Sequence, residues 1–167
     1  MKRLLPIALL FLSGCARSAE IDAAKLKAPA GFHVSVFADT KAKPRLMTIS
    51  PSGTLLVTAT SDGLLLALPD TDHDGSADRV VTVLSDLDAP HGIAFFQSRL
   101  YLAETGRVVR YDWNEAELKA TNPQEIVKLP RGGMHFTRTI VFNNGKLYVS
   151  TGSDCNVCVE EIGRAHV

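Results

Sequence analysis

The chain has 167 residues with 18 basic and 18 acidic side chains, so its formal net charge at pH 7 is zero. Hydrophobic residues make up 46% of the sequence and charged residues 22%. This balance is typical of a globular protein of at most one domain, and it excludes a disordered or collagen-like chain. Because the Lys and Arg residues are scattered and the net charge is zero, we expect no nucleic-acid partner.

Residues 1–15 have the pattern of a bacterial lipoprotein signal peptide. A basic start precedes the apolar residues 4–12, which are too short to span a bilayer, and Ser13 and Gly14 then precede Cys15. We expect lipidation of Cys15 and export to the periplasm, with an outer-membrane lipid anchor because Ala16 rather than Asp follows the cysteine. The alternative is an ordinary secretory signal that is cleaved a few residues later.

Two further cysteines, Cys155 and Cys158, lie close to the C-terminus. Export permits disulfides, so we expect these two to pair, although so short a loop restrains little of the unfolded chain. Val159 rather than His follows the second cysteine, which argues against a c-type haem. A redox-active dithiol or half of a zinc site are the alternatives.

A repeat of hairpins follows a linker at residues 16–29 and organises residues 30–160. Three similar segments each contain an apolar strand, a polar turn and a second apolar strand, and their anchor residues Val57, Leu102 and Val149 lie 45 and 47 residues apart. That period is the length of a four-stranded propeller blade, so the sequence predicts an all-β fold, a β-propeller with about three blades present. Only residues 114–120 have a helical pattern.

A propeller blade buries its faces only against neighbouring blades, and such rings usually have four to eight blades. We therefore expect this chain to be the N-terminal part of a longer protein. Residues 161–167 resemble the conceptual translation of a sequencing adapter, and we interpret them as a non-native tail; the alternative is a natural helical continuation.

Four carboxylates at residues 70–78 form the most specific local pattern. Asp70, Asp72, Asp74 and Asp78 alternate along a tight loop, which favours a structural calcium ion. The loop is not an EF-hand, because Val81 stands where a bidentate Glu is required and strands flank it. The alternative is a solvated acidic hairpin turn without metal.

Two histidines stand just before predicted strands. His135 follows a pair of glycines, and with Arg138 three residues later it forms a candidate for a base and a cation in one cleft. From spacing alone, however, a histidine beside Phe136 is more often a hydrogen-bonded packing residue. His91 occupies a similar corner one blade earlier, where we expect a hydrogen-bonding role, and Glu104 is expected to stabilise a turn.

Several segments in this order resemble the PQQ-dependent sugar dehydrogenases (PQQ is pyrroloquinoline quinone), specifically the L-sorbosone dehydrogenase-like branch. The matching strings are APAGFHVSVFAD, DTDHDGSADRV, APHGIAFFQSRLYLAETGRVVRY and GGMHFTRTIVFNNGKLYVSTGS with the following CNVC, and they cover nearly all of residues 29–159.

The resemblance implies a six-bladed propeller that binds PQQ and calcium in its axial cleft and oxidises a sugar or a related alcohol or aldehyde. His135 would be the general base. We also expect Arg138 to contact an anionic group of cofactor or substrate, on the ground of its charge and not of a family motif. Many relatives place an orienting Asp directly after the glycine that matches Gly152. This chain has Ser153 there and Asp154 one residue later, which leaves the orienting role open. We expect no activity from this chain alone, and a non-catalytic propeller that binds a protein or glycan is the alternative function.

Overall fold

The structure is a computed structural model that describes residues 23–131, 133–153, 156 and 165–166. The chain divides into two compact units between Val36 and Phe37. The described part of the first unit holds a short 3-10 helix, η1 (Ala23–Lys25), and a turn in which the Phe32 N–H donates to the Pro29 carbonyl oxygen at 3.1 Å. Within these described ranges, no helix is long and apolar enough to span a membrane.

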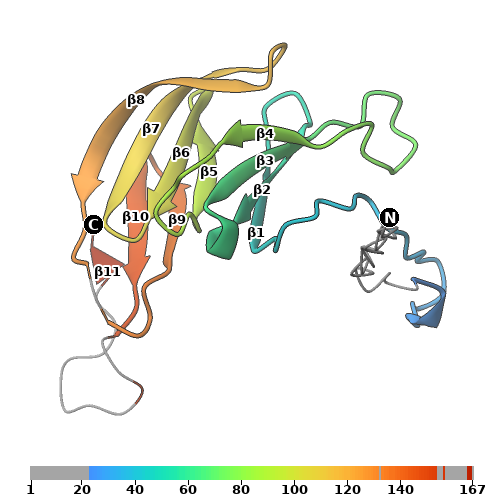
Figure 1. Ribbon diagram of the computed structural model, residues 1–167, viewed down its shortest axis with the longest axis horizontal. Coiled ribbons are helices and arrows are strands. Elements are labelled where there is room, and N and C mark those ends of the chain that lie inside the picture. Colours follow the sequence, from blue (N-terminus) through green and yellow to red (C-terminus); the bar gives the residue numbers. More distant parts are fainter. Residues whose placement is uncertain (1–22, 132, 154–155, 157–164, 167) are drawn as a thin grey trace, which may run out of the picture. The chain divides into compact units, whose positions relative to one another are not determined.

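Three antiparallel sheets build the second unit (Figure 1). Their strand orders are β1-β2-β3-β4, β5-β6-β7-β8 and β11-β10-β9, so sequential hairpins form each of the first two sheets. A single 3-10 turn, η2 (Thr60–Asp62), connects β2 to β3. The strands are β1 (Leu46–Ile49), β2 (Leu55–Ala59), β3 (Leu64–Leu68), β4 (Val81–Leu84), β5 (Ile93–Phe96), β6 (Arg99–Glu104), β7 (Arg107–Asn114), β8 (Lys119–Lys128), β9 (Arg138–Asn143), β10 (Lys146–Thr151) and β11 (Ala165–His166).

The middle sheet buries both of its faces, which explains why β6 is almost continuously apolar. Successive side chains of a strand point to opposite faces. Leu100 and Leu102 pack in a core shared with the first sheet, whereas Tyr101 and Ala103 pack in a second core with Ile140 of the third sheet. The faces of neighbouring sheets therefore pack against each other, as the blades of a propeller do.

The inner strands of neighbouring sheets meet along one line. β1 contacts β5, and β5 contacts β9. Hydrogen bonds join the first ends of these strands. Thr58, which pairs with the first residue of β1, donates from Oγ1 to the His91 carbonyl oxygen just before β5, at 3.0 Å. The Gly92 N–H, also just before β5, donates to the carbonyl oxygen of Arg138, the first residue of β9, at 2.8 Å. We call these first ends of β1, β5 and β9 the starting rim, and their last ends the opposite rim. Sheets fanned from adjacent inner strands confirm the predicted β-propeller with about three blades.

The strand pairing agrees with the 45- to 47-residue repeat. The three anchor residues Val57, Leu102 and Val149 each pair with the inner strand of their own sheet. Their partners are Met47, Ile93 and Ile140.

The helix predicted at residues 114–120 is absent, and a hairpin between β7 and β8 takes its place. Asn114 pairs with Lys119 across the hairpin, and the Asn114 side-chain oxygen accepts the Glu117 N–H at 3.1 Å. Leu118 adopts a left-handed backbone conformation (φ 51°) and is buried. Packing of Leu118 in the core between the first two sheets thus overrides the weak helical preference of this short segment.

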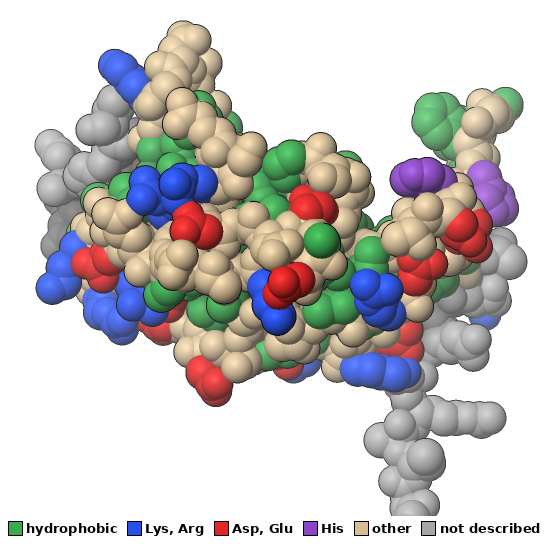
Figure 2. Space-filling model, turned by 90° about the horizontal axis from the view of Figure 1, so that it is seen from above, with side chains coloured by type: hydrophobic (Ala, Val, Ile, Leu, Met, Phe, Trp, Pro, Cys, Tyr) green, Lys and Arg blue, Asp and Glu red, His purple; other side chains and the backbone are tan. Residues whose placement is uncertain are grey.

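Charges of both signs are mixed on the surface. In Figure 2, Lys and Arg side chains lie among Asp and Glu side chains on the visible face. Arg99 with Asp112 and Lys119 with Glu117 form ion pairs whose side chains are substantially exposed. Exposed pairs contribute about 0–1 kcal/mol each, so the buried contacts between the sheets dominate the stability.

Candidate functional site

His135 lies in the loop that leads from β8 to the start of β9, on the starting rim. Its side chain is exposed, and its Nε2 atom lies 2.7 Å from Oδ1 of Asn156. The imidazole is therefore accessible to a ligand while one ring nitrogen is engaged by the protein. An exposed imidazole with a defined hydrogen-bond partner is suited to proton transfer.

Arg138, the first residue of β9, fixes the backbone of this loop. Only 2% of the residue is exposed. Its Nη1 donates to the carbonyl oxygens of His135 (3.1 Å) and Thr137 (3.2 Å), and its Nη2 donates to that of Pro130 (2.9 Å). A planar guanidinium can hold several acceptors in a fixed arrangement. The structure thus gives Arg138 a bracing role beneath His135, and its contact to a cofactor stays a prediction.

The segment after β10 packs directly against His135 at Gly152. A Cβ atom placed on Gly152 would lie 2.3 Å from the His135 Cβ and 2.4 Å from the His135 carbonyl oxygen. No real side chain tolerates such distances, so only glycine allows this approach. Gly152 and Asn156, four residues apart, therefore contact His135 at its Cβ and at its ring.

His91 is a buried structural residue on the same rim. Its Nδ1 lies 3.0 Å from the Arg138 carbonyl oxygen, as expected for a hydrogen-bonding corner residue. His91 and His135 precede corresponding strands but differ in register. Ile93 and Ile140 occupy matching positions in their sheets, so the residue that matches His91, two positions earlier, is Arg138.

Glu104 stabilises the turn between β6 and β7, as predicted. Its side chain is 1% exposed in the ion pair with Arg107, and its carboxylate accepts hydrogen bonds from the Arg107 Nε (2.9 Å) and the Asp88 N–H (3.0 Å). A carboxylate so satisfied is an integral part of the turn.

Three of the four loop carboxylates converge. Ligand atoms of Asp70, Asp72 and Asp74 lie within 4.8 Å of one another, whereas Asp78 turns to Thr71 and accepts from its N–H (2.9 Å) and its hydroxyl (2.7 Å). These two bonds, the hydroxyl bond foremost, lower the pKa of Asp78. The structural calcium site stays a prediction, with Asp70, Asp72 and Asp74 but not Asp78 as its candidate ligands.

The acidic loop belongs to the first sheet, whereas His135 precedes β9 of the third sheet. It follows β3, which ends beside Leu55, and Leu55 pairs with Ile49 at the last end of β1. The loop is therefore on the opposite rim. The carboxylates of this loop and the imidazole of His135 belong to different sites.

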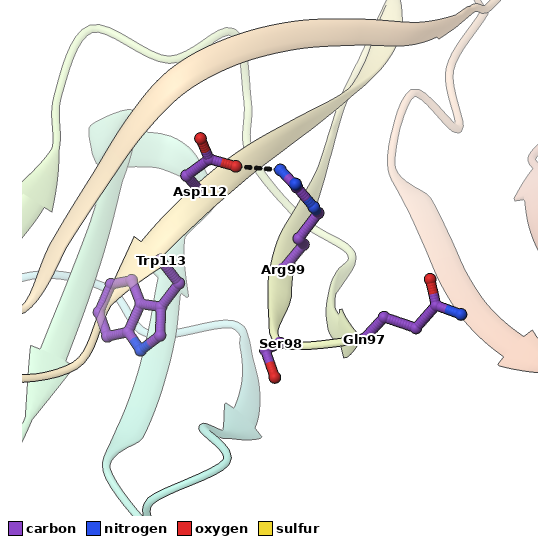
Figure 3. A pocket seen from close by; sticks show the side chains of 5 residues that line it. All are labelled: Gln97, Ser98, Arg99, Asp112 and Trp113. Carbon is purple, nitrogen blue, oxygen red and sulfur yellow. Dashed lines mark hydrogen bonds and ion pairs between the residues drawn. The ribbon is translucent and has the colours of Figure 1, made fainter.

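A shallow hollow of about 220 Å³ also lies on the opposite rim (Figure 3). Gln97 and Ser98 form the turn between β5 and β6, and the ion pair of Arg99 with Asp112 lines the hollow together with Trp113. This hollow contains none of the predicted site residues.

The partner of His135 is Asn156, which was not predicted. Ser153 and Asp154 were the candidates for this role, and the run around Asn156 was predicted only to form a disulfide loop. Asp154, together with Cys15, Cys155 and Cys158, lies outside the described residues, so lipidation and the disulfide stay predictions. The sequence signal for Asn156 is its position four residues after Gly152.

The fold places the chain in the class of β-propellers, with an accessible histidine on the starting rim. Comparison with known proteins identifies the family. The chain belongs to the TrAA12-like family, which matches residues 26–165. The PQQ-dependent pyranose dehydrogenase of Coprinopsis cinerea is 30% identical over 150 residues. This match covers 82% of the chain and 20% of the relative, so the chain spans about a fifth of the length of that enzyme.

Solved structures share the fold. The holo PQQ domain of pyranose dehydrogenase from Coprinopsis cinerea superposes with a TM-score of 0.63 and 27% identity, covering 71% of this chain and 30% of that one. The iodide and calcium structures of Trichoderma reesei Carbohydrate-Active Enzymes Family AA12 superpose with TM-scores of 0.72 and 0.63, at 22% and 24% identity. They cover 84% and 74% of this chain and 37% and 32% of theirs, and at this identity they show the fold alone.

The described residues fit one part of a PQQ site. His135 provides an accessible imidazole whose backbone is fixed by Arg138 and Gly152. Arg138 fits less well as a direct contact to PQQ carboxylates, because its Nη1 and Nη2 already donate to three backbone carbonyl oxygens. These residues thus offer such a site an accessible imidazole on a fixed backbone.

Proposed function

We propose that this chain is the part of an exported PQQ-dependent sugar dehydrogenase that carries its general base. The observation that supports this most strongly is the exposed imidazole of His135, supported from below by Arg138 and Gly152. Its occurrence in a chain 30% identical to a PQQ-dependent pyranose dehydrogenase makes oxidation of a sugar the best explanation for such an arrangement.

The residues of this chain act on the proton of the substrate. PQQ, when bound, would accept the hydride from the sugar carbon. The neutral imidazole of His135 accepts the hydroxyl proton as that C–H bond breaks, and general bases of this kind contribute about 10²- to 10⁴-fold. Arg138 and Gly152 hold the loop so that the imidazole stays at one place and in one orientation.

The test is dye-linked oxidation of sugars by the full-length protein. We expect turnover only after PQQ and calcium are added, and a loss of about 100-fold or more in kcat for His135→Ala with PQQ binding retained in a fluorescence titration. His33→Ala is the matched control, because His33 is also an exposed histidine but lies in the first unit. Undiminished turnover of His135→Ala would remove His135 from the mechanism. We expect the 167-residue chain alone to be inactive, since it aligns with only 30% of the relative's PQQ domain.

The substrate belongs, in this proposal, to the sugars and related alcohols or aldehydes that the sorbosone-type resemblance implies, oxidised to a lactone or an acid. Comparison of kcat/KM for L-sorbosone, glucose and pyranoses tests this branch. A protein that oxidises none of them under loaded conditions, yet binds a glycan or protein, would instead be the non-catalytic propeller.

Export with a lipid anchor at Cys15 completes the proposal. Its support is the lipobox pattern at residues 12–15 alone. In bacteria fed a labelled fatty acid, we expect label in the wild-type protein and none in Cys15→Ser. Equal labelling of both would contradict the anchor and leave an ordinary secretory signal.

A further inference from the structure

We propose that Asn156 is the positioning residue of His135, an inference that rests on the proposed function of His135 as a base. The Asn156 Oδ1 lies 2.7 Å from the His135 Nε2, which is a short distance for a hydrogen bond between neutral groups. An amide oxygen only accepts, so Nε2 carries the proton of this bond. Nδ1 is then the nitrogen with the free electron pair, and it is the atom that takes the substrate proton.

The contacts of Gly152 and Arg138 with His135 support this role independently of the hydrogen bond. Gly152 admits the segment after β10 to direct contact with the His135 Cβ, so the same segment reaches the ring four residues later. On the other side, Arg138 holds the His135 carbonyl oxygen at 3.1 Å. The backbone, the Cβ and the ring of His135 are each constrained by a different residue, and Asn156 alone among these three acts on the ring.

An amide differs from a carboxylate in this position because it adds no charge. It selects one tautomer and one ring orientation through its oxygen alone. A carboxylate would perform the same orientation but would also favour the protonated ring, which cannot act as a base. We therefore expect Asn156→Asp to retain the tautomer and Asn156→Ala to lose it.

The experiment is NMR of the protein labelled with ¹⁵N in its histidine rings, at a pH where the rings are neutral. For His135 we expect the ring ¹⁵N shifts of a protonated Nε2 and an unprotonated Nδ1. Asn156→Ala should move both shifts toward those of a mixture of the two tautomers, and Asn156→Asp should keep Nε2 protonated. Asn143→Ala is the matched control, because Asn143 is an exposed asparagine in the neighbouring strand β9. The buried His91 ring reports in the same spectrum whether each variant is folded.

A second measurement ties the hydrogen bond to the reaction. In the full-length, loaded enzyme, Asn156→Ala should lower kcat by about 10-fold or more with KM nearly unchanged, since orientation and not binding is lost. An Nδ1–H form of His135, or identical spectra of wild type and Asn156→Ala, would overturn the positioning role even in an active enzyme. If the spectra are as expected but the full-length protein shows no dehydrogenase activity, the hydrogen bond between Asn156 and His135 is upheld and the proposed function is refuted.

Discussion

The His91 Nδ1 atom lies 3.0 Å from the Arg138 carbonyl oxygen and joins the start of β5 to the start of β9. Because a carbonyl oxygen only accepts, Nδ1 carries a proton in this bond. Burial lowers the pKa of His91, and the nearby charge of Arg45 lowers it further, against the opposing effect of the bond to Arg138. His91 is therefore a neutral ring in the folded protein near pH 7.

This pKa makes stability depend on pH in a defined direction. The unfolded chain binds a proton at His91 near pH 6.5, whereas the folded protein binds it only at lower pH. Stability should therefore be lost as pH falls below about 6.5 and down through the folded pKa. Urea denaturation between pH 5 and 8 measures this. His91→Asn should show a shallower dependence than wild type; an equal or steeper dependence would contradict the assignment.

Gly152→Ala should displace His135. The new methyl group would meet the His135 Cβ and backbone, and such overpacking costs about 1–3 kcal/mol. Chemical denaturation measures the cost, and the ring ¹⁵N shifts of His135 should move toward those of a mixture of tautomers. In the control Gly106→Ala, the methyl group meets only the side chain of Arg131, which is 68% exposed and can move away. A larger loss of stability for Gly106→Ala would contradict the close packing at His135.

Leu102→Ala should destabilise the contact between the first two blades. Leu102 is fully buried in their shared core, and removal of such a side chain costs about 2–5 kcal/mol. Val141→Ala is the comparison, because Val141 is 57% exposed on β9 and should change stability by less than about 0.5 kcal/mol. Equal midpoints in urea for both variants would show that the blades do not rely on this core.

Ser50→Ala should weaken the link between the first two blades. The Ser50 hydroxyl donates to Glu115 Oε1 at 2.6 Å, and the Trp113 Nε1 donates to Oε2 at 2.7 Å. Burial raises the pKa of Glu115, but the bonds from Ser50 and Trp113, with smaller ones from Thr54 and Ser52, outweigh burial and lower it.

A lowered carboxyl pKa contributes stability above its unfolded value of 4.5 that is lost as pH falls through the folded pKa. Ser50→Ala should thus cost about 1.5–3 kcal/mol at pH 7 and much less near pH 3. Denaturation at both pH values measures the difference, with Ser52→Ala as a milder control because only the Ser52 backbone contacts Glu115. A cost that is equal at both pH values would argue against the charged hydrogen bond.

The alternation of apolar residues and the repeat were sufficient to predict the strands and the blades, since side-chain direction in a strand follows directly from sequence position. The pairing of Val57, Leu102 and Val149 with inner strands is such a local consequence. Residues 114–120 were wrongly predicted to be helical, because burial of Leu118 against another blade is not encoded in the short segment itself.

The sequence by itself thus determined the strand pattern, the blade repeat and His135 as a candidate. Only the tertiary structure decided what surrounds His135, because its partner Asn156 is 21 residues away and the distance between them depends on the path of the chain through β9 and β10. The same holds for Arg138, whose charge suggested a ligand contact. Folding buries its guanidinium, and a buried cation needs acceptors, which three backbone carbonyl oxygens of the adjacent loop provide.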